Sequence, residues 1–394
     1  MRIRSFGPDA TAADLRALTP PPRDVEADVR DIVEEVRSGG DAAVRRLTER
    51  FDKAELAPAE LAVPPAEIEA AIGTLEPAVL AGLRTAIGNV RAAAEAQLRE
   101  PVAVELDAGQ TLAIDEVPVR RAAAYVPGGR APYPSTVVMC AITARAAGVE
   151  ELAVCAPPGP EGRAHPAILA ACGLCEVSEV YRMGGAQAIA ALAYGTESVP
   201  AVDVIVGPGN RWVTEAKRQV AGVVGIDGLA GPSELVVVAG AGADGELIAL
   251  DMLAQAEHGP DALVVLISPD DKLVSEVAMK LETLAEQRPS VVAEVVVVVG
   301  ADDAGSAVRL AEAMAPEHLQ LVGAGVEELV PLVRSAGAVF VGRDAGTAFG
   351  DYVAGSNHVL PTGGAARFAS ALSVSTFRRR MARISLPDGA AARL

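Results

Sequence analysis

Residues 121–148 read RAAAYVPGGRAPYPSTVVMCAITARAAG, which is an apolar run, a loop rich in Gly and Pro, and then a helical segment. The same succession continues with LAVCAPP at 152–158, HPAILAACG at 165–173, EVYRMGG at 179–185, AQAIAALAYG at 186–195 and VDVIVGPG at 202–209. Strands that alternate with helices predict a parallel sheet with right-handed crossovers. This stretch therefore predicts an α/β fold.

A second series of the same kind follows. It consists of ELVVVAG at 234–240, a helix over 245–259, ALVVLISP at 262–269, a charged helix over 271–288, VVAEVVVVVG at 291–300, a helix near 305–314, LQLV at 319–322, a helix near 326–336 and AVFVG at 338–342. Two α/β modules are expected, with a break near Ala230-Gly231-Pro232. Residues 24–100 read as mostly helical and 101–120 as strands, whereas the chain after Asp351 reads as loops and one helix.

Composition excludes several functions. The 394 residues are 51% hydrophobic, which suits buried parallel sheets, but only 3% aromatic. The net charge of −18 and the single Trp argue against nucleic-acid binding, which needs basic patches and stacking platforms. The N-terminus lacks an apolar signal core and no long apolar run follows, so we expect a cytoplasmic protein. Cys172-Gly-Leu-Cys175 has no second pair, so buried thiols are expected rather than a zinc site.

The four histidines are the first candidates for chemistry. His258 follows Gln255 by three residues where a helix stops at Gly259-Pro260, so both side chains can face one ion or substrate. A histidine favoured by the helix dipole is the alternative. His165, before Pro166, reads as a surface residue at a helix start.

Glu317 and His318 are adjacent at the entrance to the strand LQLV, where two proton-transfer groups can share one cleft. An incidental surface pair is the alternative. His358 lies on a loop seven residues after Asp351, and a carboxylate with an imidazole there could hold a metal or a polar substrate.

Four Gly-rich stretches each follow an expected strand: 126–129, 184–185, 207–210 and 231–233. Ligand loops of open α/β sheets lie at such positions, so we expect all four at one edge of a sheet. None has the G-x-G-x-x-G spacing of a dinucleotide fingerprint.

Seven segments occur in an order and spacing that resemble histidinol dehydrogenase over nearly the whole chain after residue 20. They are RAAAYVPGGRAPYPSTVVM, GGAQAIAALAYGTESVPAVDVIVGPGN, VTEAKRQV, AGPSELVVVA, LAQAEHGPDA, APEHLQL and GDYVAGSNHVLPTGGAARFASALSV. The resemblance implies two incomplete Rossmann-like domains with a helical N-terminal region and a short C-terminal extension. It assigns 1–20 to an N-terminal extension, 21–120 with 233–372 to the zinc and acid–base domain, 121–232 to the NAD domain, and 373–394 to a shortened C-terminal segment.

The resemblance also implies a cytoplasmic homodimer that oxidises L-histidinol to L-histidine through an aldehyde, with one zinc ion per subunit and two NAD, as the last step of histidine biosynthesis. Zinc would be bound by Gln255, His258 and Asp351. Glu317 and His318 would act as acid–base groups. Substrate contacts are implied for Ser233, Gln255, His258, His318, Asp351 and His358, and NAD contacts for Tyr125, Gln187 and Asn210.

One departure keeps alternatives open. Members of the family continue with a pattern like EGL…H that supplies a carboxylate and a fourth zinc ligand, whereas no histidine follows His358 here. We therefore expect either a truncated chain or a divergent member. The alternatives are a related zinc- and NAD-dependent dehydrogenase of another small alcohol, such as a sulfonated diol, or an inactive relative that binds without turnover.

Overall fold

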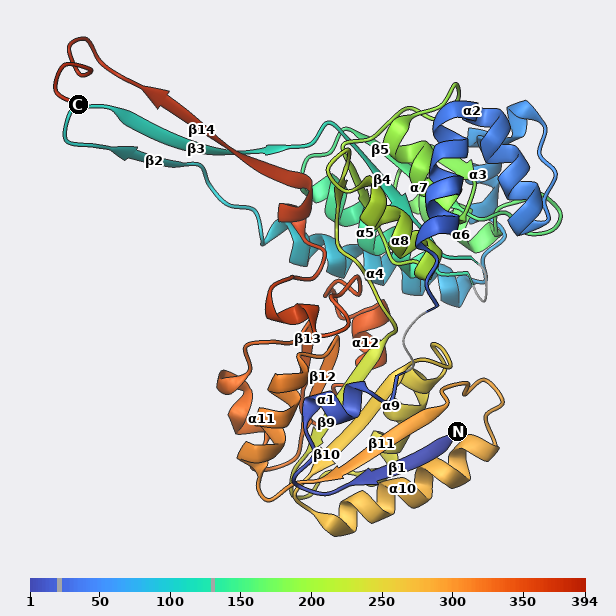
Figure 1. Ribbon diagram of the computed structural model, residues 1–394, viewed down its shortest axis with the longest axis vertical. Coiled ribbons are helices and arrows are strands. Elements are labelled where there is room, and N and C mark those ends of the chain that lie inside the picture. The colour runs from blue at the N-terminus through green and yellow to red at the C-terminus, as the bar shows by residue number, and fades with distance from the viewer. Residues whose placement is uncertain (20–22, 129–131) are drawn as a thin grey trace. The chain divides into compact units, whose positions relative to one another are not determined.

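The computed structural model describes residues 1–19, 23–128 and 132–394, which form two compact α/β units (Figure 1). The first unit comprises Met1–Glu26 and Gly228–Ala371, and the second comprises Ala27–Asp227 and Leu372–Leu394. The expected α/β class, built on parallel sheets with a helical N-terminal region, is confirmed.

A six-stranded parallel sheet forms the first unit, in the order β1-β11-β10-β9-β12-β13. Its strands are β1 (Arg2–Phe6), β9 (Glu234–Ala239), β10 (Leu263–Ser268), β11 (Val295–Gly300), β12 (His318–Val322) and β13 (Ala338–Val341). Its helices are α1 (Ala12–Arg16), α9 (Gly245–Ala256), α10 (Asp271–Glu286), α11 (Ala304–Met314) and α12 (Thr347–Tyr352), with short 3-10 turns at Glu327–Leu332 and Ala365–Arg367.

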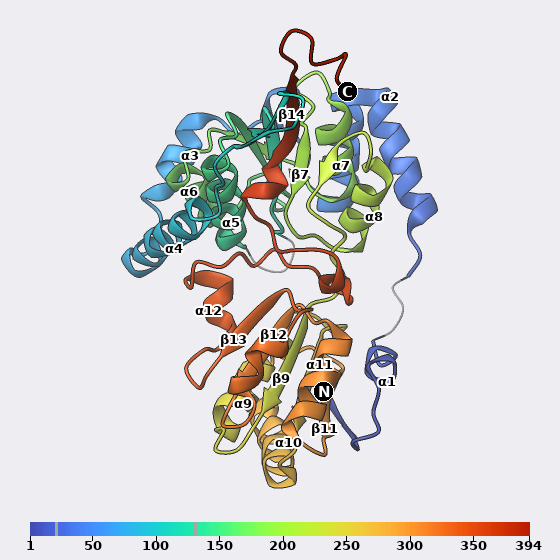
Figure 2. The same cartoon turned by 90° about the vertical axis from the view of Figure 1, so that its left-hand side faces the viewer.

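Alternate side chains of these strands enter two separate cores, because successive residues of a strand point to opposite faces. Leu235 and Val237 of β9 pack with α9 and α10 on one face. Val236 and Val238 pack on the other face, with α11 and with Leu15 of α1. Figure 2 shows α9 and α11 on opposite sides of β9. Such two-sided burial explains why the central strands read as continuous apolar runs.

The second unit is built on a parallel sheet in the order β6-β5-β4-β7-β8. Its strands are β4 (Arg121–Tyr125), β5 (Glu151–Ala156), β6 (Glu179–Arg182), β7 (Val204–Val206) and β8 (Gly225–Ile226). Its helices are α2 (Glu26–Asp52), α3 (Pro65–Ile72), α4 (Pro77–Glu95), α5 (Pro134–Ala146), α6 (Pro166–Leu174), α7 (Gly185–Tyr194) and α8 (Arg211–Val220), with 3-10 turns at Pro58–Glu60 and Val374–Phe377. An antiparallel ribbon of β2 (Val102–Glu105), β3 (Thr111–Pro118) and β14 (Arg378–Ser385) completes it (Figure 1).

The observed units differ from the expected domain ranges in where residues 27–120 belong. These residues join the unit of 121–227 instead of the unit of 233–372. Tertiary contacts cause this, since α3 packs on α6 and α4 on α5, and the backbone N–H of Val63 donates to the carbonyl of Val180. The helices α3 and α4 of the N-terminal region therefore pack against helices of the second unit.

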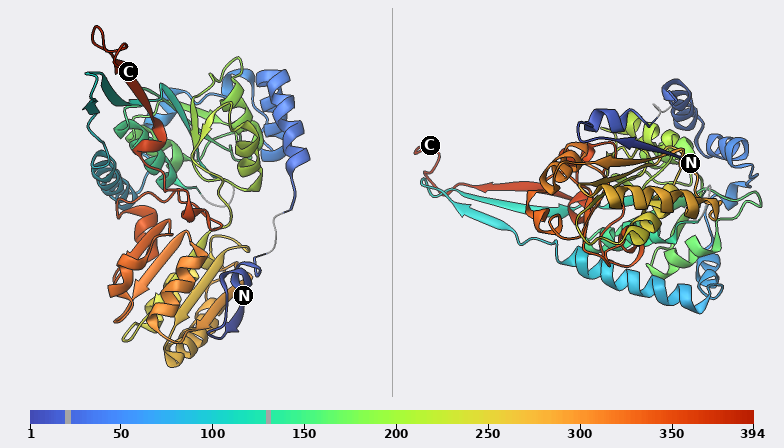
Figure 3. Two further views of the ribbon diagram at one scale, coloured as in Figure 1. Left: turned by 60° about the vertical axis from the view of Figure 1, so that its left-hand side comes forward. Right: turned by 90° about the horizontal axis from the view of Figure 1, so that it is seen from below.

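Three further elements differ from expectation. Residues 2–6, expected within an extension, form an edge strand paired with β11 (Figure 3). The helix expected near 326–336 is a 3-10 turn over Glu327–Leu332, since Pro331 lies inside it and cannot donate an α-helical hydrogen bond. The C-terminal segment forms β14, whose pairing with β3 is set by a partner more than 250 residues away in the sequence.

Candidate active site

The predicted Glu317-His318 pair lies at the amino ends of β12 and β9. Helix α11 ends at Met314, and the left-handed backbone of Ala315 (φ 46°, ψ 61°) and the following Pro316 turn the chain into β12. Parallel pairing sets His318 opposite Leu235, so Glu317 comes beside Ser233 and Glu234. The sequence therefore predicted the position of the pair at a strand entrance correctly.

Glu317 is buried and accepts two hydrogen bonds on the same carboxylate oxygen, Oε2. The hydroxyl of Ser233 donates at 2.6 Å and the backbone N–H of Glu234 donates at 2.8 Å. Burial raises the pKa of Glu317 above its usual value, although His318 and both hydrogen bonds act in the opposite direction. A buried carboxyl whose pKa is raised toward neutrality is suited to accept and return a proton.

His318 is held between a carbonyl and a carboxylate. Its Nδ1 lies 3.0 Å from the carbonyl oxygen of Glu234, so in the neutral ring the proton belongs on Nδ1 and Nε2 keeps its lone pair. Nε2 faces Oδ1 of Asp351 at 3.7 Å. Burial opposes the charged form, but Asp351 and Glu317 outweigh it and raise the pKa of His318 to about 9.

Asp351, on α12, interacts with His358 and His258 as well as with His318. The Nδ1 of His358 lies 2.8 Å from the carbonyl oxygen of Asp351. Burial would raise the pKa of Asp351, but the hydrogen bond from His318 and the charges of His318, His358 and His258 lower it. Burial lowers the pKa of His358. The sequence predicted Asp351 and His358 on one loop, whereas Asp351 lies on α12 and His358 on the loop after it; the two are in contact, and Asp351 reaches His318.

Helix α9 brings Gln255 to the same place. The side chain of Gln255 is buried at the end of α9, and its Nε2 donates to the hydroxyl of Ser233 at 2.6 Å. His258 is exposed one turn later, and its N–H donates to the carbonyl of Gln255 at 3.1 Å. Asp251, one turn earlier, accepts from the N–H and hydroxyl of Thr347 and so ties α9 to the start of α12. The sequence did not predict this contact between Asp251 and Thr347, which fixes the helix that bears Asp351.

The three side chains expected to bind zinc offer different donor atoms. Over the residues that the structure describes, no group of three His, Cys, Asp or Glu side chains is arranged to hold a metal ion. The expected set instead combines an amide oxygen of Gln255 with the imidazole of His258 and the carboxylate of Asp351. Nitrogen and oxygen donors of these types suit zinc, which takes four ligands in most sites. The donor chemistry therefore fits zinc, and these three side chains supply three of the four ligands that most zinc sites have.

The expected cofactor residues all lie in the second unit. Tyr125 ends β4, and its hydroxyl accepts from the N–H of Gly185 at 3.2 Å. Gln187, in the first turn of α7, donates to Oδ2 of Asp52 at 3.4 Å. Asn210 is exposed and caps α8, accepting from the N–H groups of Trp212 and Val213. Tyr125 and Gln187 are brought together, and Asn210 follows the neighbouring strand β7.

The carboxyl edge of this sheet includes a topological switch point, where ligands of open α/β sheets bind. Strands β5 and β6 lie on one side of β4, and β7 and β8 lie on the other. The order in which successive strands are added therefore reverses between β4 and β7. Ligands of open α/β sheets bind outside the carboxyl ends of the strands at such a reversal. Gly207 is needed there, because its φ is 106° and a Cβ would lie 2.1 Å from the carbonyl oxygen of Tyr125.

The Gly-rich loops do not share one edge, contrary to expectation. The described part of 126–129 and the loops at 184–185 and 207–210 follow β4, β6 and β7, but 231–233 leads into β9 in the other unit. Gly129 lies outside the described residues. The fourth loop differs because it connects the units, and it delivers Ser233 to the amino end of a strand.

The remaining predictions concern residues outside both groups. His165 is exposed and caps α6, its Nδ1 accepting from the N–H of Ala167, as expected for a helix start. Cys172 and Cys175 are free and buried, and burial raises the pKa of the Cys175 thiol to about 12. These thiols are therefore core residues.

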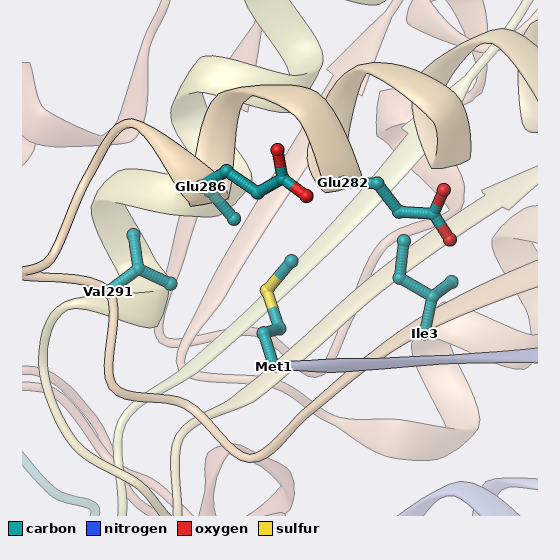
Figure 4. A pocket seen from close by; sticks show the side chains of 6 residues that line it. Met1, Ile3, Glu282, Glu286 and Val291 are labelled. Carbon is teal, nitrogen blue, oxygen red and sulfur yellow. The ribbon is translucent and has the colours of Figure 1, made fainter.

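A cavity of about 270 Å³ lies elsewhere in the first unit, between β1 and α10 (Figure 4). It is lined by Met1, Ile3, Glu282, Ala285, Glu286 and Val291, and shares no residue with the site.

Among the described helices none is long and apolar enough to cross a membrane alone. One bent pair, α3 with α4, meets the criteria of length and composition only when both helices are counted together.

Comparisons with known proteins agree over nearly the whole chain. The family model described as histidinol dehydrogenase matches residues 19–394. Histidinol dehydrogenase from Synechococcus is 46% identical over 358 residues, covering 89% of this chain and 82% of its own. The Cereibacter sphaeroides enzyme is 48% identical over 364 residues, covering 91% and 83%. The crystal structure of histidinol dehydrogenase from Elizabethkingia anophelis superposes with a TM-score of 0.92 at 31% identity, covering 100% of this chain and 92% of that one.

Proposed function

The chain belongs to the histidinol dehydrogenase family of oxidoreductases, and from this we propose that it oxidises L-histidinol to L-histidine with zinc and two NAD. The balanced reaction takes the alcohol, one water and two NAD⁺ to the carboxylate, two NADH and three protons. The observation that carries the proposal is the pair of adjacent proton-transfer groups, Glu317 and His318, whose neighbours give them different environments.

His318 is proposed to take the alcohol proton in the first oxidation. Its Nδ1 is engaged by the carbonyl of Glu234, so Nε2, which faces Asp351, is the ring atom proposed to take the proton. Asp351 beside Nε2 stabilises the imidazolium that forms. The pKa of His318 is about 9, so the ring takes the alcohol proton in its neutral form, whose fraction grows as the pH rises toward 9.

Glu317 is proposed to activate water in the second stage. Its Oε2 is occupied by Ser233 and Glu234, which leaves Oε1 to accept a proton from water. Addition of that water to the aldehyde gives a hydrate, from which a second hydride and proton can leave. The raised pKa of Glu317 makes its carboxylate a stronger base for this proton than an ordinary glutamate.

Gln255, His258 and Asp351 would hold zinc, with substrate contacts from Ser233, His318 and His358. When bound, zinc would fix the amine and imidazole nitrogens of histidinol, and each NAD would accept one hydride. Tyr125, Gln187 and Asn210 would contact NAD, since they lie at the carboxyl edge of the second sheet where its strand order reverses.

The proposal extends to the assembly and its role. We place zinc and acid–base chemistry in the first unit and NAD binding in the second, within a cytoplasmic homodimer that completes histidine biosynthesis. The family resemblance supports the dimer and the pathway. Light scattering on the purified chain would test the dimer, and growth of a histidine auxotroph carrying the gene would test the pathway.

The deciding experiment measures NADH formed from histidinol and, separately, from histidinal. Two NADH per histidine are expected. His318→Asn should slow alcohol oxidation, whereas Glu317→Gln should mainly slow aldehyde oxidation; His165→Asn, in the other unit, is the control. Turnover of a sulfonated diol but not of histidinol would reassign the substrate, and zinc binding without any turnover would identify an inactive relative.

A further inference from the structure

Arg16 reaches from the N-terminal helix α1 into the neighbourhood of the catalytic pair. Its guanidinium binds the carboxylate of Glu234 through two nitrogens, at 2.6 Å and 3.3 Å. It also donates to the carbonyl of Met314 at the end of α11. The side chain of Glu234 is only 6% exposed, so this is a largely buried ion pair of fork geometry. Arg16 precedes residue 19, where the family match begins.

Glu234 is the residue whose backbone holds both catalytic side chains. Its N–H donates to Glu317 and its carbonyl oxygen accepts from His318. Glu234 is the first residue of β9 and its N–H donates to Glu317, so the position of this N–H depends on what fixes the start of the strand. The side chain of Glu234 is fixed by Arg16 and by the N–H of Gly363 at 3.2 Å.

We propose that Arg16 is a positioning residue for the reaction: by gripping the carboxylate of Glu234 it sets the backbone of Glu234, and through it the orientation of Glu317 and His318. The catalytic roles of those two residues rest on the proposed function, whereas the positioning of their side chains does not. The N-terminal segment thereby contributes to the active site without contacting substrate.

Different residues of α1 attach the helix to the core and bind Glu234. A capping box between Thr11 and Asp14 starts the helix, and the fully buried Leu15 anchors it in the core beside α11. Attachment is thus provided by Leu15, and Arg16 is free to turn toward Glu234. Without Arg16, the Glu234 carboxylate would stay buried near the Glu317 carboxylate with one neutral donor, which favours displacement of the strand start.

Hydrogen exchange on the full chain tests the positioning directly. Arg16→Met keeps the length of the side chain and removes the fork, so the amides of residues 231–235 other than Pro232, which has none, should exchange about tenfold faster or more, while those of β7 stay unchanged. Arg343→Met is the matched control, since it breaks the Arg343–Asp244 pair (3.1 Å) in the same unit away from the site. Unchanged exchange over 231–235 in Arg16→Met would overturn the proposal, whether or not the chain oxidises histidinol.

Kinetics then tests the consequence. Arg16→Met should lower kcat by between about tenfold and a hundredfold and leave the KM for NAD within about twofold, since displaced catalytic groups slow the chemical step. Arg16→Lys, which keeps the charge, should recover part of kcat. A kcat for Arg16→Met within twofold of wild type, or a loss that only follows the folded fraction, would contradict the role. If the wild-type chain forms no NADH, the proposed function fails, and the exchange result still decides the positioning.

Discussion

Replacement of Asp52 by Asn should stabilise the second unit, and the size of the effect can be worked from the structure. Asp52 ends α2, half-buried, with the amide of Gln187 as its hydrogen-bond donor at 3.4 Å. No cation pairs with it among the described residues. Burial therefore raises the pKa of Asp52 from 3.8 to about 6.

The raised pKa means that folding is opposed whenever Asp52 is ionised. The penalty is nearly absent below pH 3.8, grows between pH 3.8 and 6, and is complete above pH 6. A shift of about two units corresponds to about 3 kcal/mol. Because the group is partly solvated, screening reduces this to about 1–2 kcal/mol. Asp52→Asn removes the charge at nearly constant volume and should recover that amount at pH 7.5.

Urea denaturation followed by circular dichroism at pH 7.5, 5 and 4 measures the difference. The advantage of Asp52→Asn should fall to about half at pH 5 and to little at pH 4. Asp41→Asn on the same helix is the matched control with the opposite sign. Burial opposes the Asp41 charge, but hydrogen bonds from Ser198 and Thr196 outweigh it and lower its pKa, so this variant should destabilise the protein at pH 7.5. An advantage of Asp52→Asn that does not change with pH would refute the reasoning.

Three further perturbations test the two sites. Gly207→Ala should cost several kcal/mol in melting experiments, since its Cβ would meet the carbonyl oxygen of Tyr125 at 2.1 Å, whereas Gly222→Ala, with φ 99° and open space, should cost about 1 kcal/mol; equal losses would contradict the clash. In metal-free protein, histidine NMR should show His318 titrating near pH 9 and at lower pH in Glu317→Gln, because one of two anions is gone; a midpoint near 6.5 would refute this. Gln255→Leu should lose bound zinc by elemental analysis, and full retention would remove Gln255 from the ligands.

Local sequence patterns predicted much of the fold and part of the site. The alternation of apolar runs and helices predicted both parallel sheets because each strand is buried on two faces. The position of Glu317-His318 followed from Pro316 and the apolar run after it. Such signals lie within a few residues of the feature they predict, which is why one sequence sufficed.

What the sequence could not show depends on distant partners. The short strand β1 has a polar pattern and becomes a strand only because β11 offers an open edge. The Arg16–Glu234 pair joins residues 218 positions apart, and neither is marked by a motif that pairs them. Asp251 reads as one acidic residue of a helix until Thr347 is seen to donate to it. Charge pairs across such separations need the tertiary fold.

The two groups of candidate residues lie at opposite ends of their sheets, and the backbone gives a reason. In the first unit the group gathers at the amino ends of β9 and β12, toward which the C-terminal ends of α9 and α11 point. Carbonyl groups at helix C-termini favour cations, such as zinc or the ammonium group of histidinol. In the second unit, Tyr125, Gln187 and Asn210 lie at carboxyl ends of strands, where α7 and α8 begin. Helix N-termini favour anions such as the pyrophosphate of NAD. The opposite placement therefore matches the opposite charges of the two proposed ligands.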